Sequence, residues 1–355
     1  MKIAEKKKLK KQESQTKNSD ARMIKVAING FGRIGRLFFR AAMQNQEFKS
    51  KFEIVAINDL TDAKTLAHLL KYDSSFGTLQ DNVTSSETTL AFNGSEIKIL
   101  AVKDPLQLPW KDYGVELVIE SSGLFTERNE ALKHITAGAK KVIISAPAKN
   151  PDATIVMGVN QEKYNPSMQI VSMASCTTNS IAPPLKVVID EFKIIKGFLT
   201  TAHAYTNDQR ILDLPHKDLR RARAAAINTI PTSTGAAKAI YEVIPELKGK
   251  MDGISLRVPV PVGSISDLTL QLEKTVTKEQ INEALKKASE TRMKGVMRYS
   301  EEELVSSDIK GETHTAIIDG KLTNTIGDLA KIFSWYDNEY GYSTKLVELS
   351  NYIYK

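Results

Sequence analysis

Cysteine is almost absent from this sequence: Cys176 is the only one among 355 residues. A single thiol excludes an intramolecular disulfide and a Cys-x-x-Cys redox pair. It also fits a reducing compartment, so we expect a cytoplasmic protein. The sequence has no apolar run near the roughly 20 residues that span a bilayer, and we expect no membrane partner.

Motifs of several common enzyme classes are missing as well. The chain has no G-x-S-x-G of serine hydrolases, no Walker A loop, no HExxH helix and no cluster of metal ligands. We therefore expect no bound metal. The hydrophobic fraction of 41% and the charged fraction of 26% are those of an ordinary globular protein, and the length suits two domains.

Positive charge is concentrated at the N-terminus. The net charge is +7, but residues 1–22 contain eight Lys or Arg against three Asp or Glu, so this segment carries most of it. Its polar, aperiodic composition predicts a basic, disordered extension. A second basic cluster, Arg220, Arg221 and Arg223, lacks the aromatic side chains of a nucleic-acid platform. We expect a solvated or subunit-contacting loop there, and no nucleic acid in the main function.

A glycine-rich turn follows the first apolar run of the chain. Ile24–Asn29 predicts a buried strand and Arg36–Gln46 a helix, and the glycines between them follow the pattern G-x-G-x-x-G. A second predicted strand, Phe52–Ile57, is followed by Asp59, which can accept a hydrogen bond from a ribose hydroxyl and disfavours a 2′-phosphate. The context predicts an NAD site. Its glycines are Gly30, Gly32 and Gly35.

Predicted strands and helices alternate up to about residue 150, and the pattern of predicted elements then changes. The alternation predicts an α/β fold with a Rossmann-type, mostly parallel sheet. After Cys176 the strand patterns are longer and more alternating, which predicts a second, α+β catalytic domain with a mixed sheet. We expect an NAD-binding domain over 23–174, a catalytic domain over 175–338 and a C-terminal helix, 339–355, that packs back on the first domain.

The lone thiol lies among polar neighbours, in the segment Ser175–Asn179. Hydroxyl and amide groups there can bind an anion, whereas a structural cysteine usually lies among aliphatic residues. A helix start close to the thiol would lower its pKa. A nucleophilic thiol needs a base, and His203 and His216 are both candidates, because spacing in the sequence cannot separate them.

Two further polar features could bind an anionic substrate. Thr232–Gly235 precedes a predicted helix over Gly235–Ile244 and could hold a phosphate, although a plain helix cap explains it equally well. Arg257 lies in an otherwise apolar predicted strand, which fits either a ligand or a structural ion pair. A dinucleotide site, one thiol, candidate bases and anion sites together indicate aldehyde oxidation through a thioester.

Four segments of the chain together match the pattern of one enzyme family: Ile28–Arg36, Ser175–Asn179, Tyr205–Ala226 and Trp335–Glu339. On these segments, and over Met23–Lys355 as a whole, the chain resembles the phosphorylating glyceraldehyde-3-phosphate dehydrogenases. The resemblance implies that Cys176 is the nucleophile and that His203, rather than His216, is the base. Glyceraldehyde 3-phosphate would then be oxidised with NAD and inorganic phosphate to 1,3-bisphosphoglycerate, through a hemithioacetal and a thioester.

The resemblance also implies binding roles for individual residues. The substrate phosphate would be bound by Thr206 and Arg257. The attacking phosphate would be bound by Ser175, Thr177, Thr234 and Gly235. NAD would contact the glycine turn and, beyond it, Arg33, Ile34, Asp59, Lys103, Ser145, Asn338 and Tyr342.

Finally, the resemblance implies a homotetramer in which the loop around Leu212–Arg223 reaches a neighbouring cofactor site. The chain departs from the family pattern at Ser180, where many members have a second cysteine. It also departs at Pro184, which follows Pro183 and makes the helix after the thiol uncertain. The alternatives are an erythrose-4-phosphate dehydrogenase and an additional RNA- or surface-binding role of the basic extension.

Overall fold

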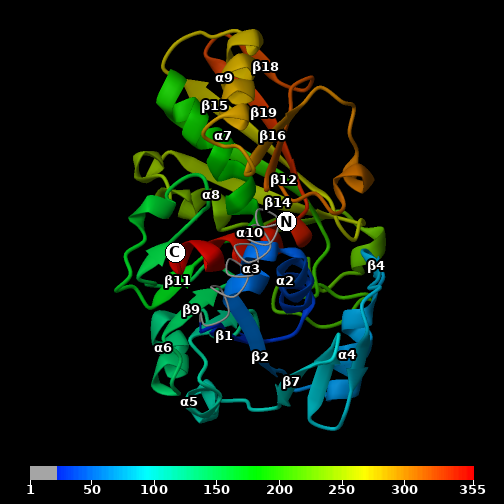
Figure 1. The fold of residues 1–355 in the computed structure, drawn as a ribbon. Helices are drawn as coiled ribbons and strands as arrows, with labels where there is room; N and C mark the ends of the chain where they lie inside the picture. The colour runs from blue at the N-terminus through cyan, green and yellow to red at the C-terminus, as the bar shows by residue number, and fades with distance from the viewer. Residues whose placement is uncertain (1–21) are drawn as a thin grey trace, which may run out of the picture.

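The computed structural model describes residues 22–355. The expected disordered extension therefore lies, apart from Arg22, outside the described residues. Within the described range the chain forms two large sheets that occupy separate halves of the molecule (Figure 1). The predicted fold class is confirmed, because the first sheet is mostly parallel with helices on both faces and the second is mixed. The domain limits at 23–174 and 175–338 stay a prediction.

The first sheet has the strand order β10-β11-β9-β8-β1-β2-β7-β6-β5. Neighbouring strands are parallel from β10 to β7, and β6 and β5 add an antiparallel edge. A parallel sheet of this kind places ligands at the carboxyl ends of its strands. The strands are β1 (Ile24–Asn29), β2 (Phe52–Asn58), β5 (Val83–Ser85), β6 (Thr89–Phe92), β7 (Ser95–Leu100), β8 (Leu117–Glu120), β9 (Lys141–Ile144), β10 (Ala153–Thr154) and β11 (Ile170–Ser172).

Alternation along β1 explains why helices cover both faces of this sheet. Val26 and Ile28 point into one apolar cluster, shared with α2, α4 and α10, whereas Ala27 points into another, shared with α5 and α6. The C-terminal helix α10, which was expected to pack back on the first domain, contacts α2 extensively. These helices, with two short strands, are α2 (Arg33–Gln44), α3 (Gln46–Lys51), α4 (Ala63–Lys71), β3 (Tyr72–Asp73), β4 (Gly77–Thr78), α5 (Trp110–Tyr113), α6 (Arg128–Thr136) and α10 (Tyr340–Ile353).

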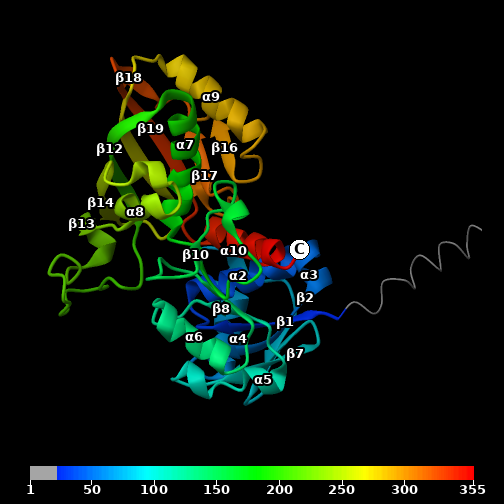
Figure 2. The ribbon, with the colours of Figure 1, turned by 90° about the vertical axis from the view of Figure 1, so that its left-hand side faces the viewer.

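The second sheet has the order β13-β14-β12-β15-β19-β17-β16, with β18 paired to β19. Its mixed character comes from two parallel pairs, β12 with β14 and β16 with β17, among antiparallel ones. Figure 2 shows α7 and α9 on the same side of this sheet. The elements are α7 (Cys176–Phe192), β12 (Ile194–Ala204), β13 (Ile230–Ser233), α8 (Ala236–Ala239), β14 (Met251–Val258), β15 (Ser264–Leu272), α9 (Lys278–Glu290), β16 (Met297–Ser300), β17 (Ala316–Asp319), β18 (Asn324–Ile326) and β19 (Leu329–Tyr336).

Helix α7 passes through both prolines without a break. Pro184 has no N–H, so the carbonyl oxygen of Ser180, four residues earlier, loses its usual helical partner. The hydroxyl of Ser334 on β19 donates to that carbonyl at 3.1 Å, and the Oγ atoms of Ser180 and Ser334 lie 3.0 Å apart. A side chain from the sheet thus replaces the missing backbone donor, which resolves the uncertainty about this helix.

One of two expected helices differs from the structure in length. The predicted helix over Gly235–Ile244 is only a four-residue α8, followed by a 3₁₀ turn at Ile240–Glu242. By contrast, α7, whose start was expected close to the thiol, begins at Cys176 itself, because Ser175 caps it by accepting from the Thr178 N–H at 3.0 Å. No helix within 22–355 is long and apolar enough to cross a membrane.

Candidate active site

The thiol and an imidazole meet at the junction of α7 and β12. Cys176 is the first residue of α7, and its Sγ lies 3.4 Å from Nε2 of His203, near the end of β12. His216 lies in the long loop after β12, where its Nδ1 accepts from the Asp218 N–H at 2.9 Å. Of the two histidines that the sequence left open, the structure therefore brings His203 to the thiol.

The other ring nitrogen of His203 determines which way a proton can move. Nδ1 lies 2.6 Å from the carbonyl oxygen of Ala204 and 2.5 Å from Nη1 of Arg257. It cannot donate to the carbonyl and accept from the guanidinium at the same time. Only the tautomer with its proton on Nδ1, donated to Ala204, leaves Nε2 free to accept a proton from Cys176.

Burial governs the resting charge of this pair. Burial first, and the Arg257 charge second, lower the pKa of His203 to about 3. Burial also raises the pKa of the Cys176 thiol, against the lowering effect of Arg257 and of the N–H groups at the helix start. The sequence correctly placed a helix start near the thiol, and the N–H groups there lower the thiol pKa as expected, but desolvation is the larger effect and raises it.

A cavity of about 500 Å³ opens above the thiol and is lined from both halves of the chain. Nine of its lining residues were predicted from the sequence: Arg33, Ile34, Ser145, Ser175, Cys176, His203, Thr206, Asn338 and Tyr342. Eight were not: Ser74, Ser75, Ala146, Pro147, Tyr205, Asn207, Pro261 and Glu339. The missed residues lie on loops, whose approach to the cavity depends on tertiary packing.

Each glycine of the turn after β1 has a different environment. Gly30 has φ of +89°, and a Cβ added there would lie 2.5 Å from Ser122 Cα. Gly35 packs against the carbonyl oxygen of Gly30, so it too has no room for a side chain. Gly32 is exposed and has no neighbouring atom within 4 Å of an added Cβ. The first and third glycines serve packing, whereas the second leaves backbone open to a ligand.

Asp59 fixes the same turn from the end of β2. One carboxylate oxygen accepts from the Phe31 N–H at 2.8 Å, and the other accepts from the Thr61 N–H at 3.1 Å. Each oxygen retains a second lone pair for a ligand hydroxyl. Lys103, predicted to lie near the same ligand, is exposed in the loop after β7 and outside the cavity lining.

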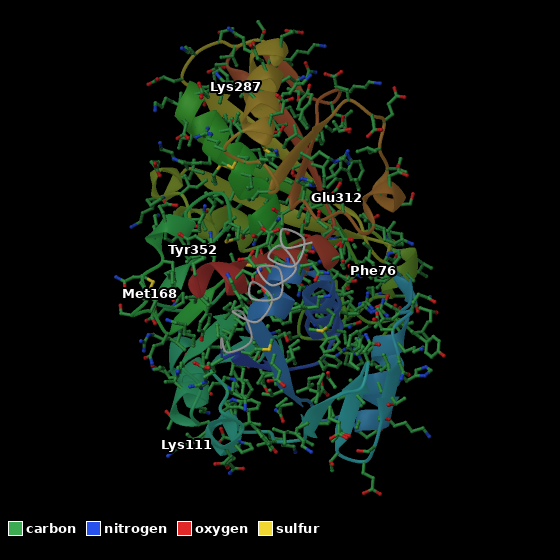
Figure 3. The ribbon with its side chains drawn as sticks, in the orientation of Figure 1. Phe76, Lys111, Met168, Lys287, Glu312 and Tyr352 are labelled. Carbon is green, nitrogen blue, oxygen red and sulfur yellow. The ribbon has the colours of Figure 1, made fainter. Side chains whose placement is uncertain are left out.

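The Arg33 side chain joins the start of α2 to two segments that are distant in the sequence. Its guanidinium pairs with Asp73, after α4, and with Glu339, before α10, where Nη2 lies 2.6 Å from Oε2. It also lies 5.8 Å from the ring centroid of Phe76, which is labelled in Figure 3. Neither ion pair was predicted from the sequence, because both partners are distant from Arg33 along the chain.

The Asn338 and Tyr342 side chains are held in fixed orientations at the cavity. The Asn338 Oδ1 accepts from the Ser264 hydroxyl at 3.0 Å and from the Gly263 N–H at 3.2 Å. This orients the carboxamide so that Nδ2 is the group left for a ligand. The Tyr342 hydroxyl donates to the Ala174 carbonyl at 2.8 Å, which holds its ring against the start of α7.

The candidate anion-binding side chains are only partly assembled. The Thr206 hydroxyl donates to Asp208, and Arg257 approaches His203 from β14. The Thr234 hydroxyl accepts from the Ala236 N–H at 3.2 Å, in a short turn before α8, whose N-cap is Gly235. Of the six residues predicted to bind phosphate, four do not line the cavity itself, namely Thr177, Thr234, Gly235 and Arg257.

Tyr336 is a site residue to which the sequence gave no role. It is 1% exposed, and its hydroxyl lies 2.9 Å from Oγ1 of Thr177 and 3.0 Å from Oγ1 of Thr201. Its ring packs edge-on against His203, with centroids 5.9 Å apart. Burial raises the pKa of Tyr336 well above its usual value, so the phenol stays protonated. Only its place beside Asn338 in the Trp335–Glu339 segment could have pointed to it.

No group of three or more His, Cys, Asp or Glu side chains in the described part of the chain is arranged to hold a metal ion. The polar groups of the cavity are instead hydroxyls, amides, one thiol, one imidazole and charged side chains. These groups suit acid–base and covalent chemistry on an organic substrate.

Comparisons with known proteins agree with this geometry. The family model "Glyceraldehyde 3-phosphate dehydrogenase, NAD binding domain" matches residues 24–128, and "Glyceraldehyde 3-phosphate dehydrogenase, C-terminal domain" matches residues 175–338. The glyceraldehyde-3-phosphate dehydrogenase of Geobacillus stearothermophilus is 58% identical over 332 residues, which are 93% of this chain and 98% of the relative. That of Borreliella burgdorferi is 56% identical over 340 residues, 94% of this chain and all of the relative (100%).

These similarities extend over the glycine turn, the thiol segment and both sheets. They confirm the resemblance that the motifs indicated, and they confirm NAD as the cofactor. The chain therefore belongs to the glyceraldehyde-3-phosphate dehydrogenase family.

Proposed function

We propose that the chain oxidises glyceraldehyde 3-phosphate to 1,3-bisphosphoglycerate in glycolysis, with NAD and inorganic phosphate. The observation that carries this proposal is the 3.4 Å approach of Cys176 Sγ to His203 Nε2. That pair lies in a cavity reached from the glycine-turn half and from the mixed-sheet half. A thiol nucleophile, its base and a dinucleotide site are the parts that aldehyde oxidation through a thioester needs.

His203 serves as the base and, in its protonated form, as the acid. Its Nε2 takes the thiol proton as the Cys176 sulfur attacks the aldehyde carbon, and it returns that proton to the new alkoxide oxygen, which gives a hemithioacetal. Bound NAD supplies the acceptor for the hydride that leaves this carbon. His203 takes the hydroxyl proton as the carbonyl of the thioester forms. Inorganic phosphate then attacks the thioester, releasing the acyl phosphate and the Cys176 sulfur.

The phosphate groups are assigned to two clusters of donors. Arg257 and Thr206 suit the substrate phosphate, because the guanidinium lies beside His203 and the Thr206 hydroxyl is on the cavity wall. The attacking phosphate is assigned to Ser175 and Thr177 at the start of α7, together with Thr234 and Gly235 before α8. Hydroxyls and free N–H groups at a helix start favour an anion.

The glycine turn fits the pyrophosphate of NAD. The open space around Gly32 is a cradle that a side chain would fill, and α2 begins at the next residue, so its N–H groups face that space. Asp59 is assigned to the adenosine ribose and Lys103 to the adenine side. Ser145, Asn338 and Tyr342 are assigned to the nicotinamide side, with Ile34 flanking the ring.

An uncovered sheet face supports a homotetramer. Helices α7 and α9 cover one face of the mixed sheet, whereas the other face carries Phe198, 66% exposed, and Ile254, 50% exposed. The loop after β12 adds further exposed apolar side chains, among them Ile211 and Leu219. Apolar surface of this extent marks contact with another protein surface, and a second copy of the chain is the occupant we propose.

The proposed function is tested by following NADH absorbance with glyceraldehyde 3-phosphate, with and without phosphate. Sustained turnover should require both NAD and phosphate, and Cys176→Ser should abolish it. Erythrose 4-phosphate is run in parallel, and faster turnover of that aldehyde would favour the sister enzyme. Absence of turnover in a folded protein that binds NAD would overturn the proposal.

Location and the N-terminal extension are also proposals. A cytoplasmic location is supported by the catalytic thiol, which must stay reduced to act as a nucleophile. An RNA- or surface-binding role for the basic extension concerns residues outside the described range. Deleting residues 1–22 tests it, because a role of the extension requires RNA retention to fall after the deletion.

A further inference from the structure

A buried carboxylate lies beneath the glycine turn and takes no part in the proposed chemistry. Glu120, the last residue of β8, is 1% exposed. Its Oε2 accepts from Asn29 Nδ2 at 2.6 Å and faces His134 Nε2 at 3.0 Å. Its Oε1 accepts from the Ser122 N–H at 2.9 Å and from the Ser122 hydroxyl.

The protonation state of His134 follows from its other partner. Trp110, on α5 beside the Lys111 labelled in Figure 3, donates its indole N–H to His134 Nδ1 at 2.9 Å. An indole nitrogen can only donate, so Nδ1 is the acceptor and Nε2 carries the proton that is given to Glu120. The Ser122 Oγ accepts from the Leu124 N–H at 3.2 Å, which turns its own proton toward Glu120.

Glu120 therefore receives four donors and supplies none. Only an ionised carboxylate satisfies this pattern, because a carboxamide or a protonated acid would direct a donor at one of the four. Four hydrogen bonds compensate the burial of its charge. The arrangement holds the carboxylate in one orientation.

The network spans the carboxyl ends of neighbouring strands. Asn29 ends β1 and also accepts, through Oδ1, from Asn58 Nδ2 at the end of β2, at 2.7 Å. Asn58 in turn accepts from the Val102 N–H at 2.9 Å, after β7. These are the strand ends beside which the nucleotide lies in a parallel sheet of this kind.

The same network holds the loop at Ser121 and Ser122 against the glycine turn. Glu120 holds Ser122, whose Cα would lie 2.5 Å from a Cβ at Gly30. The Ser121 hydroxyl donates to the Gly30 carbonyl at 2.6 Å. Asn29, the other partner of Glu120, immediately precedes Gly30. The carboxylate thus holds the turn from both sides.

We propose that Glu120 is a positioning residue for NAD: with Asn29 and Ser122 it sets the backbone of the glycine turn for the pyrophosphate. The inference rests on the proposed function, in which the pyrophosphate of NAD binds at that turn. His134 holds the carboxylate from the side of α6 and contributes through it. None of these side chains reaches the reacting atoms, so the chemical step should be unaffected once NAD is bound.

The test compares Glu120→Gln with Phe48→Leu in the full-length enzyme. Phe48 stacks on Phe52 at the amino end of β2, so its variant disturbs the same half without touching the network. We expect Glu120→Gln to raise the Kd and KM for NAD at least tenfold, with kcat at saturating NAD within twofold of the parent. Phe48→Leu should leave the Kd for NAD unchanged. An unchanged Kd in Glu120→Gln would overturn the proposal.

Ser122→Ala keeps the test decisive if Glu120→Gln does not fold. It removes one donor at a partly exposed position and should weaken NAD binding at least threefold. NAD binding within error of the parent would contradict the positioning role. The Kd is measured without turnover. A parent that binds NAD but does not turn over would refute only the proposed function, and a parent that does not bind NAD would refute the proposed pyrophosphate seat.

Discussion

Arg257 Nη1 lies 2.5 Å from Nδ1 of His203, on the side of the ring opposite the thiol. The guanidinium disfavours a proton on the imidazole and favours a negative sulfur on Cys176. A substrate phosphate on Arg257 would reduce both effects, so substrate binding and proton transfer are linked through one side chain.

Arg257→Gln should therefore weaken substrate binding and change the pKa values of both Cys176 and His203. Loss of a charged hydrogen bond, worth about 1.5–3 kcal/mol, corresponds to a rise of about 10- to 100-fold in the KM for glyceraldehyde 3-phosphate. The pKa values of Cys176 and His203 should both rise, and the pH profile of Cys176 alkylation should move to higher pH. Arg292→Gln, which breaks an ion pair with Asp190, is the control. It should change neither the KM for glyceraldehyde 3-phosphate nor the pH profile of Cys176 alkylation.

Gly32→Ala should separate cofactor binding from stability. A Cβ at Gly32 meets no protein atom within 4 Å and the backbone φ is −70°, so the melting temperature should stay close to that of the parent. NAD binding should nevertheless weaken about tenfold or more, because the pyrophosphate approaches this backbone. Gly35→Ala, which would clash with the Gly30 carbonyl, should instead lower the melting temperature. Unaltered NAD affinity in Gly32→Ala would refute the pyrophosphate seat.

Ser334→Ala should destabilise the chain by about 1–3 kcal/mol, since it leaves the buried Ser180 carbonyl without a donor. In a Pro184→Ala background the restored N–H of residue 184 can donate to the Ser180 carbonyl. Ser334→Ala should therefore lower the free energy of unfolding by less in that background. A double-mutant cycle from urea unfolding measures this coupling. Ser350→Ala, which removes a hydroxyl bonded to Leu346 in α10, should show no coupling to Pro184→Ala. Additive effects of Ser334→Ala and Pro184→Ala would contradict the proposed compensation.

His203 should make the folded state sensitive to acid. Its pKa is about 3 in the folded state against an ordinary value of 6.5, so between these pH values the unfolded chain binds more protons. Stability therefore falls as the pH drops from about 6.5 toward 3. His203→Asn should show a smaller loss of unfolding free energy between pH 7 and pH 4.5 in urea titrations. An equal loss in both proteins would contradict the depressed pKa.

Local sequence pattern predicted much of the fold and the site. Apolar runs and the glycine spacing located β1, the turn and Asp59, and the polar setting of the thiol singled out Cys176. The features that were missed depend on contacts between distant segments. The Ser334 donor lies 154 positions from Ser180, and Glu339 lies 306 positions from Arg33. Burial, which outweighs the lowering effect of the helix start on the thiol pKa, is likewise a property of the folded chain.

The central claim is that a thioester forms on Cys176 and awaits phosphate. Mass spectrometry of the enzyme after mixing with NAD and glyceraldehyde 3-phosphate, in phosphate-free buffer, tests it most directly. We predict one 3-phosphoglyceroyl adduct per chain, located on Cys176, formed with one equivalent of NADH and lost when phosphate is added. NADH formation without an adduct on Cys176, or an adduct that persists in phosphate, would contradict the account.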